Sequence, residues 1–599
     1  MAFSITLTHS AEWMPLGPFG GAAMFVLVDP HCSKNIIVGT KNAALFRSQN
    51  GGESWTPLPF PAQTKATLQA IVLDRRVPGV IMAGLSTSDS VDCSGVLRSA
   101  DGGLTWQQLL ALRGKDVRAL AMWPGDSMII AAGTQDGVYL TRDGGTTWSR
   151  ISPAENRELQ PVVSLAFDPG DSSVIYAGTP HLPWKTIDGG ATWRRINAGI
   201  QDDSDIFSIQ VDRNSSQRIF AAACSGIYRS VNGGSTWAKL RGAKGASYRT
   251  YAIVQDPLHA NVLYVGTTHG LAKSEDRGNT WAMTLPYTTR GISFDLAHIG
   301  RIFVATEQAG ILRSDDSGTS WRETNRGFCN RVLFGLSSTD GGNLYVNEVN
   351  GERSSGFRLS NQNDFWENVS SAQTVPSRDQ PSARCAQRTK KTAGTSFPIS
   401  ENAADGWKEA DLPESDGVLQ GDALLNSPWP DALTTLQTFL SADATNWKAN
   451  TPVPQGVEVF GLIGTGGKSF LAATSSGLFS SDDLGTSWQA VQGEHQGNTI
   501  TAICRHPTWP SLIFLARYGS IYASSDRGGS WVKLPVGPCP TGAIKQLVAV
   551  PGAPDRLFAL TRRQGVYALP LDVHGSGIAG LPAHLLDDFH GAPATVPQH

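Results

Sequence analysis

The octapeptides TRDGGTTW (141–148) and TIDGGATW (186–193) follow one pattern that decides the fold. Ser or Thr comes first, Asp or Asn third, Gly fifth, Ser or Thr seventh and Trp last; we call this pattern the box. The remaining copies are SQNGGESW (48–55), SADGGLTW (99–106), SVNGGSTW (230–237), SEDRGNTW (274–281), SDDSGTSW (314–321), SDDLGTSW (481–488) and SSDRGGSW (524–531). Nine copies of so constrained a pattern show that the chain is built from repeats.

Tryptophan extends the repeat beyond the boxes. Thirteen of the 17 Trp residues follow one another at intervals of 40 to 51 residues. They are Trp13, Trp55, Trp106, Trp148, Trp193, Trp237, Trp281, Trp321, Trp366, Trp407, Trp447, Trp488 and Trp531. Periods of about 40 to 50 residues with several strands each are typical of propeller blades.

Each repeat contains four predicted strands. Two apolar runs precede the third strand, as in LAFDPGDSSVIYAGT (165–179), and a short strand opens at the box Trp, as in TWSRI (147–151). The box is the predicted turn between the third and fourth strands, because its Asp or Asn can accept backbone N–H groups and its Gly permits a positive φ. These structural third-position residues are Asn50, Asp101, Asp143, Asp188, Asn232, Asp276, Asp316, Asp483 and Asp526.

Composition excludes several classes of protein. The 64 Gly and 34 Pro, with only 17% charged residues, exclude a coiled coil and a charged disordered chain. A net charge of -3 without a long basic run argues against nucleic acid as a partner. No apolar stretch is long enough for membrane insertion. The seven Cys are scattered singly and no cofactor motif is present, so we expect neither a metal site nor a cofactor.

The N-terminal sequence MAFSITLTHSAEW lacks the basic and apolar regions of a secretory signal. We therefore expect a cytoplasmic location by default, and an extracytoplasmic one if a leader has been removed. The sequence does not indicate an oligomeric state.

The spacing predicts thirteen units, which favours two tandem propellers of seven and six or seven blades. We expect a propeller over 1–327, a second with degenerate blades over 328–572, and a tail over 573–599. The segment ending at Trp13 should complete the last sheet, formed by 545–571, and so leave no free sheet edge. A single ring of about ten blades is the alternative, and the irregular stretch 367–453 is either decayed blades or a linker with an inserted loop.

At these boxes the chain resembles the Asp-box (BNR repeat) propellers, which include sialidases, sortilin-type receptors, photosystem II assembly factors and xyloglucan hydrolases. The resemblance implies that the boxes lie on the side away from the ligand. It also implies a catalytic Asp in the first blade of the xyloglucan hydrolases, where GTKNAALFRS (39–48) has Lys41 and Asn42 instead. The Arg-Ile-Pro segment usual in sialidases is missing.

Candidate ligand-binding residues lie in the loops that enter each blade and in those between its second and third strands. They are Arg118, Arg157, His181, Trp184, Asp205, Arg249, Tyr287, Arg290 and Arg331. Arg pairs with carboxylates and Tyr offers flat contact area, which suits an acidic peptide or a glycan. Ordinary solvated loop charge is the alternative interpretation.

The sequence thus favours a non-catalytic scaffold that binds a protein or peptide on its funnel face. A carbohydrate-active hydrolase, of glycoside hydrolase or sialidase-like type, is the alternative, and an extracellular receptor-like module is a third. We expect no catalytic residue of the kind these enzymes require.

Overall fold

The computed structural model divides the chain into two compact units. The N-terminal unit consists of Phe19–Arg331, and the C-terminal unit of Met1–Pro18 together with Val332–His599. The described residues are 3–6, 12–61, 66–87, 94–180, 182–200, 204–240, 248–338, 342–350, 353–360, 366–369, 396–399, 408–411, 438–440, 448–450, 457–483, 485, 487–537, 544–550, 555–561 and 564–575.

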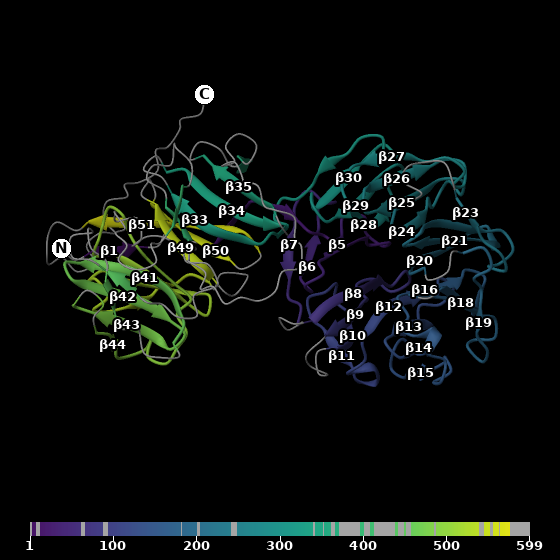
Figure 1. Ribbon diagram of the computed structural model, residues 1–599, viewed down its shortest axis with the longest axis horizontal. Helices are drawn as coiled ribbons and strands as arrows, with labels where there is room; N and C mark the ends of the chain where they lie inside the picture. The colour runs from purple at the N-terminus through teal and green to yellow at the C-terminus, as the bar shows by residue number, and fades with distance from the viewer. Residues whose placement is uncertain are drawn as a thin grey trace, which may run out of the picture. The chain divides into compact units, whose positions relative to one another are not determined.

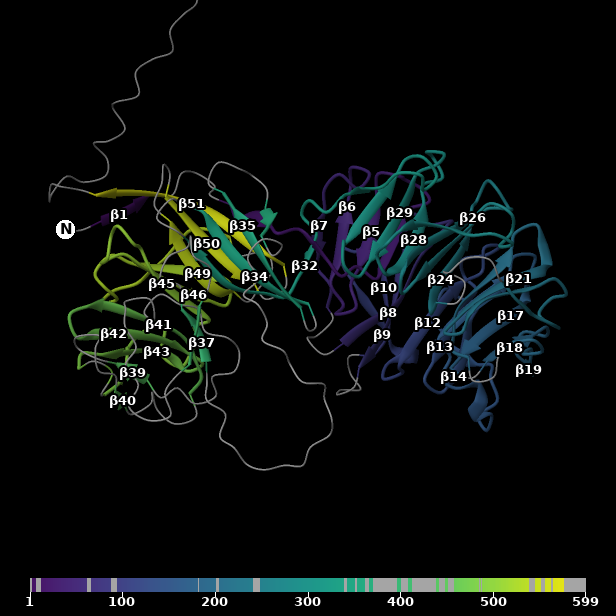
Figure 2. The ribbon, with the colours of Figure 1, turned by 45° about the horizontal axis from the view of Figure 1, so that its top comes forward.

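The N-terminal unit contains seven four-stranded antiparallel sheets, here blades 1 to 7. Figure 1 shows β8, β9, β10 and β11 in order from the centre of this unit outward, and Figure 2 shows β12, β13 and β14 side by side in one blade. The strands of blades 1 to 4 are β4 (Phe25–Val28), β5 (Ile36–Gly39), β6 (Leu45–Ser48) and β7 (Thr56–Leu58); β8 (Ala66–Leu73), β9 (Ile81–Thr87), β10 (Gly95–Ser99) and β11 (Gln107–Leu109); β12 (Val117–Met122), β13 (Ile130–Thr134), β14 (Gly137–Thr141) and β15 (Ser149–Arg150); and β16 (Ser164–Asp168), β17 (Asp171–Thr179), β18 (Leu182–Thr186) and β19 (Arg194–Arg195). Those of blades 5 to 7 are β20 (Ile206–Asp212), β21 (Ser215–Ala223), β22 (Gly226–Ser230) and β23 (Ala238–Lys239); β24 (Thr250–Gln255), β25 (Leu263–Thr267), β26 (Gly270–Ser274) and β27 (Ala282–Leu285); and β28 (Thr289–Phe294), β29 (Ile302–Thr306), β30 (Ile311–Ser314) and β31 (Arg322–Glu323). Two short 3₁₀ turns, η2 (Leu110–Leu112) and η3 (Arg157–Leu159), link blades 2 to 4.

The second strands of blades 3, 6 and 7 are buried along their whole length. Every residue of β13, β25 and β29 is buried, because each blade packs against a neighbour on both of its faces. Continuous apolar runs of this kind in a sequence indicate strands that are buried on both faces.

The boxes form the turns between third and fourth strands. In blade 2, Asp101 Oδ1 accepts hydrogen bonds from the Leu104 and Thr105 backbone N–H groups at 3.0 and 2.9 Å, and Asp101 Oδ2 accepts one from the Thr105 hydroxyl at 2.5 Å. The Gly103 N–H donates to Ser99 Oγ at 2.8 Å, so the turn is closed from both ends. Glycine is needed at the fifth position: φ is +88° at Gly52, where a Cβ would lie 2.7 Å from the Phe303 ring of blade 7.

The turns separate onto two faces. The Gly102 N–H of a box donates to Gly79 O in the 1–2 turn of the same blade, and Gly144 donates to Met128 O in the same way. On the opposite face, the 2–3 turns bond to the residues that enter an inner strand, as Gln135 N–H does to Asp116 O. We call these the box face and the funnel face.

Blade 7 packs against blade 1, with β28 beside β4, so the ring of the N-terminal unit is closed. At this junction the Trp55 indole N–H donates to Thr324 O at 2.6 Å, and Glu53 pairs with Arg313 at 2.8 Å and Arg322 at 2.7 Å. The parallel pair β3 (Gly20–Gly21) and β32 (Cys329–Asn330) ties the two ends of the unit together.

The C-terminal unit contains six further sheets. Its complete blades are β33 (Leu333–Ser338), β34 (Leu344–Asn350), β35 (Arg353–Leu359) and β36 (Trp366–Asn368); β41 (Val459–Gly466), β42 (Ser469–Thr474), β43 (Gly477–Ser481) and β44 (Gln489–Ala490); β45 (Ala502–Arg505), β46 (Ile513–Arg517), β47 (Ser520–Ser524) and β48 (Val532–Lys533); and β49 (Ile544–Val550), β50 (Asp555–Thr561) and β51 (Val566–Gly575) with β1 (Phe3–Thr6) and β2 (Met14–Gly17). Two-stranded sheets are formed by β37 (Ser396–Ile399) with β38 (Lys408–Asp411), and by β39 (Thr438–Leu440) with β40 (Lys448–Asn450). Most of 367–453 and the expected tail lie outside the described residues.

The two ends of the chain share one sheet, since β1 and β2 both pair with β51. Trp13 is buried in the same core cluster as Leu557 and Leu569. The expected domain 1–327 therefore differs from the observed division: Met1–Pro18 belongs to the C-terminal unit, because its strands fill the outer edge of that unit's last sheet.

The all-β propeller fold of four-stranded antiparallel blades is confirmed; the described residues form thirteen sheets besides the β3–β32 pair, seven in the N-terminal and six in the C-terminal unit. No helix among the described ranges is long and apolar enough to cross a membrane.

We predict that Asp101→Ala lowers the melting temperature of the N-terminal unit by a few degrees, because the turn donors lose their acceptor. Asp101→Asn should stay close to wild type, since Asn232 accepts from Thr236 N–H in the equivalent box. Hydrogen bonds, the first from the Thr105 side chain, lower the pKa of Asp101 to about 2. The Asp contribution is therefore present above pH 4 and lost as the pH falls toward 2, which Asn should not show. Thermal unfolding monitored by circular dichroism measures both effects, and an Ala variant as stable as the Asn variant would contradict the role of the box.

We also predict that Trp13→Ala destabilises the C-terminal unit by about 3–5 kcal/mol, because it empties a buried site of that unit. The matched control is Trp55→Ala, which should destabilise the N-terminal unit instead. Hydrogen exchange with peptide resolution separates the two. Faster exchange in blades 1 to 7 of the Trp13 variant would rule out the assignment of this end of the chain to the C-terminal unit.

Candidate functional site

Five of the seven inner strands of the N-terminal unit contain a β-bulge in their first half. The register shifts leave one residue unpaired in each of five inner strands: Gln69, Arg118, Phe207, Tyr251 and Arg290. The residue before each bulge is buried, whereas the bulged residue is exposed or half-buried. Because neighbouring inner strands pack against one another around the ring, these side chains surround its centre at the funnel face.

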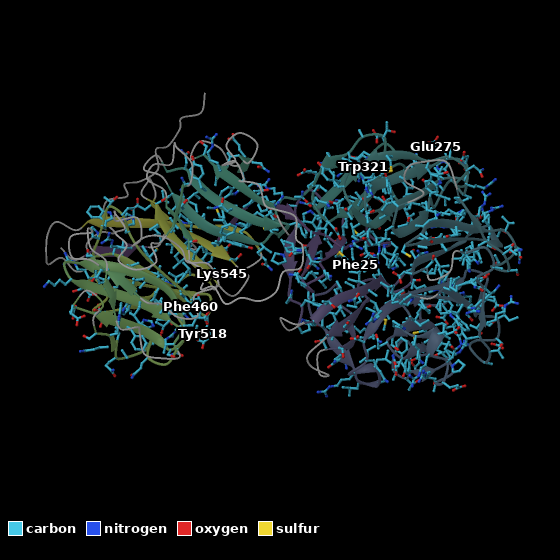
Figure 3. The ribbon with its side chains drawn as sticks, viewed as in Figure 1. Phe25, Glu275, Trp321, Phe460, Tyr518 and Lys545 are labelled. Carbon is cyan, nitrogen blue, oxygen red and sulfur yellow. The ribbon has the colours of Figure 1, made fainter. Side chains whose placement is uncertain are left out.

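Figure 3 gives the orientation of the ring: Phe25, on the inner strand β4, is labelled toward the centre, and Glu275 and Trp321 are labelled at the outer edge. Both residues belong to boxes: Glu275 is the second residue of the box 274–281, and Trp321 is the last residue of the box 314–321. These boxes join the third and fourth strands of their sheets, far from the inner strands. The box side is thus occupied by a repeated turn, and variation between blades is concentrated on the funnel side.

Four side chains of blades 5, 6 and 7 form what we call the funnel cluster: Phe207, Arg249, Tyr251 and Arg290. The Arg249 guanidinium carbon lies 4.6 Å from the centre of the Phe207 ring and 5.9 Å from that of Tyr251. The Arg290 guanidinium carbon lies 3.5 Å from the centre of the Tyr251 ring. The cluster is a series of aromatic rings and guanidinium planes that crosses three blades, and cation–π contacts of this kind stabilise by about 0.5–2 kcal/mol each.

Carboxylates hold both guanidinium groups in place. Arg249 pairs with Asp205 at 3.4 Å, and Arg290 donates through Nε to Glu307 at 2.7 Å. These partly exposed pairs add little to stability, so their main effect is to orient the guanidinium planes. The charge of the cluster is balanced, and a ligand need not be acidic to bind it.

Backbone hydrogen bonds fix the turns and strand entries that bear these charged side chains. Thr268 N–H donates to Arg249 O, Glu307 N–H to Thr288 O, and Cys224 N–H to Asp205 O, at 3.0 to 3.1 Å. Each 2–3 turn is thereby tied to the entry of an inner strand. A site on such a framework is preorganised, because little side-chain or loop entropy remains to be lost on binding.

Further rings and charges extend the funnel face on both sides. Tyr248 stacks on His269 with ring centres 3.7 Å apart. In blade 3, Lys115 Nζ lies 2.6 Å from Asp136 Oδ2, and this hydrogen bond raises the pKa of Lys115. Arg118 pairs with Asp116 at 3.4 Å. Lys41 and Asn42 lie in the 2–3 turn of blade 1, where the resemblance placed a carboxylate.

The structure brings together three of the sequence candidates, Asp205, Arg249 and Arg290. Arg118 lies on the same funnel face in blade 3, and Arg157 is exposed in η3. Tyr287 is half-buried and packs against the core between blades 6 and 7. His181 lies outside the described residues.

Two candidates have structural surroundings. Trp184 is only 7% exposed and packs against Val138 and Leu159. We expected it in a 2–3 turn, but β18 begins at Leu182, so Trp184 is a strand residue. Arg331 donates through Nε to Phe19 O at 3.1 Å, at the joined ends of the N-terminal unit. Neither belongs to the funnel cluster.

Sequence reasoning missed Phe207, Tyr251 and Glu307. Phe207 and Tyr251 stand in apolar runs, IFSIQV (206–211) and YAIVQ (251–255), that read as ordinary core strands. The signal that identifies them is their place in the repeat, one residue after the buried residue that opens each inner strand. Across the described ranges, no group of three or more His, Cys, Asp or Glu side chains is arranged to hold a metal ion.

No protein-family model matches the chain, and no curated protein matches its sequence. Among solved structures, the GH74 enzyme of Niastella koreensis is similar with a TM-score of 0.65 and 16% identity, covering 93% of this chain and 99% of that one. The GH74 xyloglucanase from Xanthomonas campestris has a TM-score of 0.58 and 16% identity, covering 93% of each chain. A structure of YCF48 bound to D1 peptide covers 52% of this chain and 99% of that one at 18% identity, with a TM-score of 0.39 that carries no argument. At these identities the likeness establishes a β-propeller fold and leaves the activity open.

Proposed function

We propose that this chain is a binding scaffold of the Asp-box class, which holds a protein or peptide segment on the funnel face of its N-terminal unit. The funnel cluster is the observation that carries the proposal. Tyr and Arg supply much of the energy at protein interfaces, and here they alternate on a preorganised surface.

The chemistry of the cluster suits an extended peptide. Each guanidinium group has five N–H donors, of which the carboxylates of Asp205 and Glu307 occupy only part. The remaining donors can bond peptide carbonyl groups while the rings of Phe207 and Tyr251 contact apolar side chains. The boxes contribute to this function only indirectly, by keeping seven inner strands in register.

A glycoside hydrolase is the second candidate. The GH74 enzymes resemble this chain in fold over nearly its whole length, and Asp205 and Glu307 place two carboxylates beside aromatic rings. Glycoside hydrolysis needs one carboxylic acid and one carboxylate free to act on the substrate, whereas both groups here are engaged by arginine. Lys41 and Asn42 also replace the carboxylate that the resemblance implies. Incubation with a panel of polysaccharides tests this candidate, and no released sugar on any of them would remove it.

We predict that peptides selected on the full chain from a random-sequence library lose affinity when the funnel cluster is changed. Tyr251→Ala and Arg249→Ala should each raise Kd by about thirtyfold, since interface hot spots of these types contribute about 2 kcal/mol. Fluorescence polarisation with the selected, labelled peptides gives the affinities.

Arg142→Ala is the matched control. Arg142 is an exposed residue at the second position of a box, so its loss removes the same charge from the box face. Selected peptides that bind both cluster variants as tightly as the control variant would refute the proposed site.

A further inference from the structure

The blade β45–β48 departs from the repeat in its 1–2 turn. In six blades of the N-terminal unit an Asp is the last residue of the first strand or directly follows it, and its Oδ1 accepts the backbone N–H of the residue two positions later at 2.8 to 2.9 Å. These residues are Asp29, Asp74, Asp168, Asp212, Asp256 and Asp295. In β45–β48 the equivalent residue is His506: its N–H donates to Leu512 O six residues on, as Asp256 N–H does to Val262 O.

His506 performs the same task with a group that titrates. Its side chain is fully buried, and Nδ1 accepts the Trp509 N–H at 3.2 Å. Nδ1 must therefore be unprotonated, which leaves the proton of the neutral ring on Nε2. Nε2 lies 3.5 Å from Asp555 Oδ2 on β50. Among the described residues, Asp555 is the one charged group within ion-pair distance of the His506 ring.

Acid acts differently on the two kinds of turn. An Asp has an acceptor oxygen in either protonation state, whereas a His loses its acceptor once both ring nitrogens carry a proton. A second proton on His506 would break the bond from Trp509 and place a charge in a site closed to water. Burial accordingly lowers the pKa of His506, although the neighbouring Asp555 acts in the opposite direction.

A second buried histidine enters the same blade. His495, in the loop between β44 and β45, is 3% exposed, and neither ring nitrogen has a hydrogen-bond partner among the described residues. Its ring meets the Tyr522 and Trp531 rings edge-on at 4.8 and 5.6 Å. The charged groups around it are Glu494 and Arg517, which pair with each other at 2.6 Å. Burial, and secondarily Arg517, lowers the pKa of His495.

We propose that the blade β45–β48 is an acid-sensitive element of the C-terminal unit, which opens when His506 and His495 take up protons. The sign follows from linkage: the unfolded histidines bind protons below about pH 6.5, and the buried ones resist. Stability is thus full above pH 6.5 and declines as the pH falls toward the lowered pKa values.

Opening of this blade would affect its neighbours, because the blade lies between two other sheets. β45 packs against β41 on one side and β49 on the other, so loss of the blade interrupts the sheet stack of the C-terminal unit. The blade also carries Tyr518, which Figure 3 labels, at the tip of the β46–β47 turn. Tyr518 is 71% exposed with φ +48°, and the adjacent Arg517 anchors this turn to Glu494 beside His495. Acid should therefore release an exposed aromatic side chain from its fixed position.

The N-terminal unit offers the internal comparison. Its His259 and His298 are more than half exposed and lie beside Asp256 and Asp295, at 3.3 and 2.7 Å. These rings are open to water and each lies beside a carboxylate, so they lack the closed surroundings of His506 and His495. We therefore expect mild acid to affect the two units differently.

Hydrogen exchange of the full chain at pH 7.5 and pH 5.5, corrected for the chemical exchange rate, tests the proposal. Protection factors of peptides from 500–534 should fall by about tenfold for each buried histidine between pH 7.5 and 5.5, and those of blade 6 should stay constant. Equal protection of 500–534 at the two pH values would overturn the proposal.

Variants assign the effect. His506→Asn keeps an acceptor for Trp509 N–H and a donor toward Asp555 but does not titrate, and His495→Phe fills the apolar site without a charge. The double variant should retain its protection at pH 5.5, whereas the control His298→Asn should behave as wild type. If the blade of the His506→Asn variant is already unprotected at pH 7.5, the His495→Phe variant is tested alone. It should show about half of the wild-type decrease in the logarithm of the protection factors. The role of these histidines would be refuted if the double variant lost as much protection at pH 5.5 as wild type does. Where only His495→Phe can be tested, an equal loss in that variant would refute it.

Discussion

A four-stranded blade has two apolar faces and cannot bury them alone, so the whole molecule depends on the closure of its rings. In the N-terminal unit the closure is made by β28 against β4 and by Trp55 against Thr324 O. In the C-terminal unit, strands near both ends of the chain share one sheet, in which β1 and β2 pair with β51. Every other feature requires this closure, because an inner strand has a fixed position only when both neighbours are present.

Antiparallel blades then separate structure from function. The 1–2 turns and the boxes share one face, where the same side-chain contacts recur from blade to blade. The 2–3 turns and the blade entries share the other, where each blade carries different residues and five of the seven inner strands contain the bulge. The funnel cluster occupies three consecutive blades of that variable face, and its guanidinium planes are positioned by Asp205 and Glu307.

The fold was predictable because the box and its Trp repeat often enough to reveal strands, turns and blade count. Asp205, Arg249 and Arg290 were predictable as charges at the blade entries. Phe207 and Tyr251 were not predicted, because one unpaired residue in a bulge reverses the inward and outward alternation within an apolar run, and only comparison of the repeats marks its position. Trp184 failed for the opposite reason: an off-period aromatic residue in an expected loop is a core residue of β18. The importance of His506 emerges only when equivalent hydrogen bonds are compared across blades.

The shared sheet of β2 and β51 has a consequence for biosynthesis. The segment Met14–Gly17 is synthesised well before β51, so it has no partner strand until β51 has been made. The N-terminal unit holds all seven of its blades within Phe19–Arg331 and can close while the rest of the chain is still being made. The two units therefore mature in sequence, and the C-terminal unit can finish only after translation has passed its final strand.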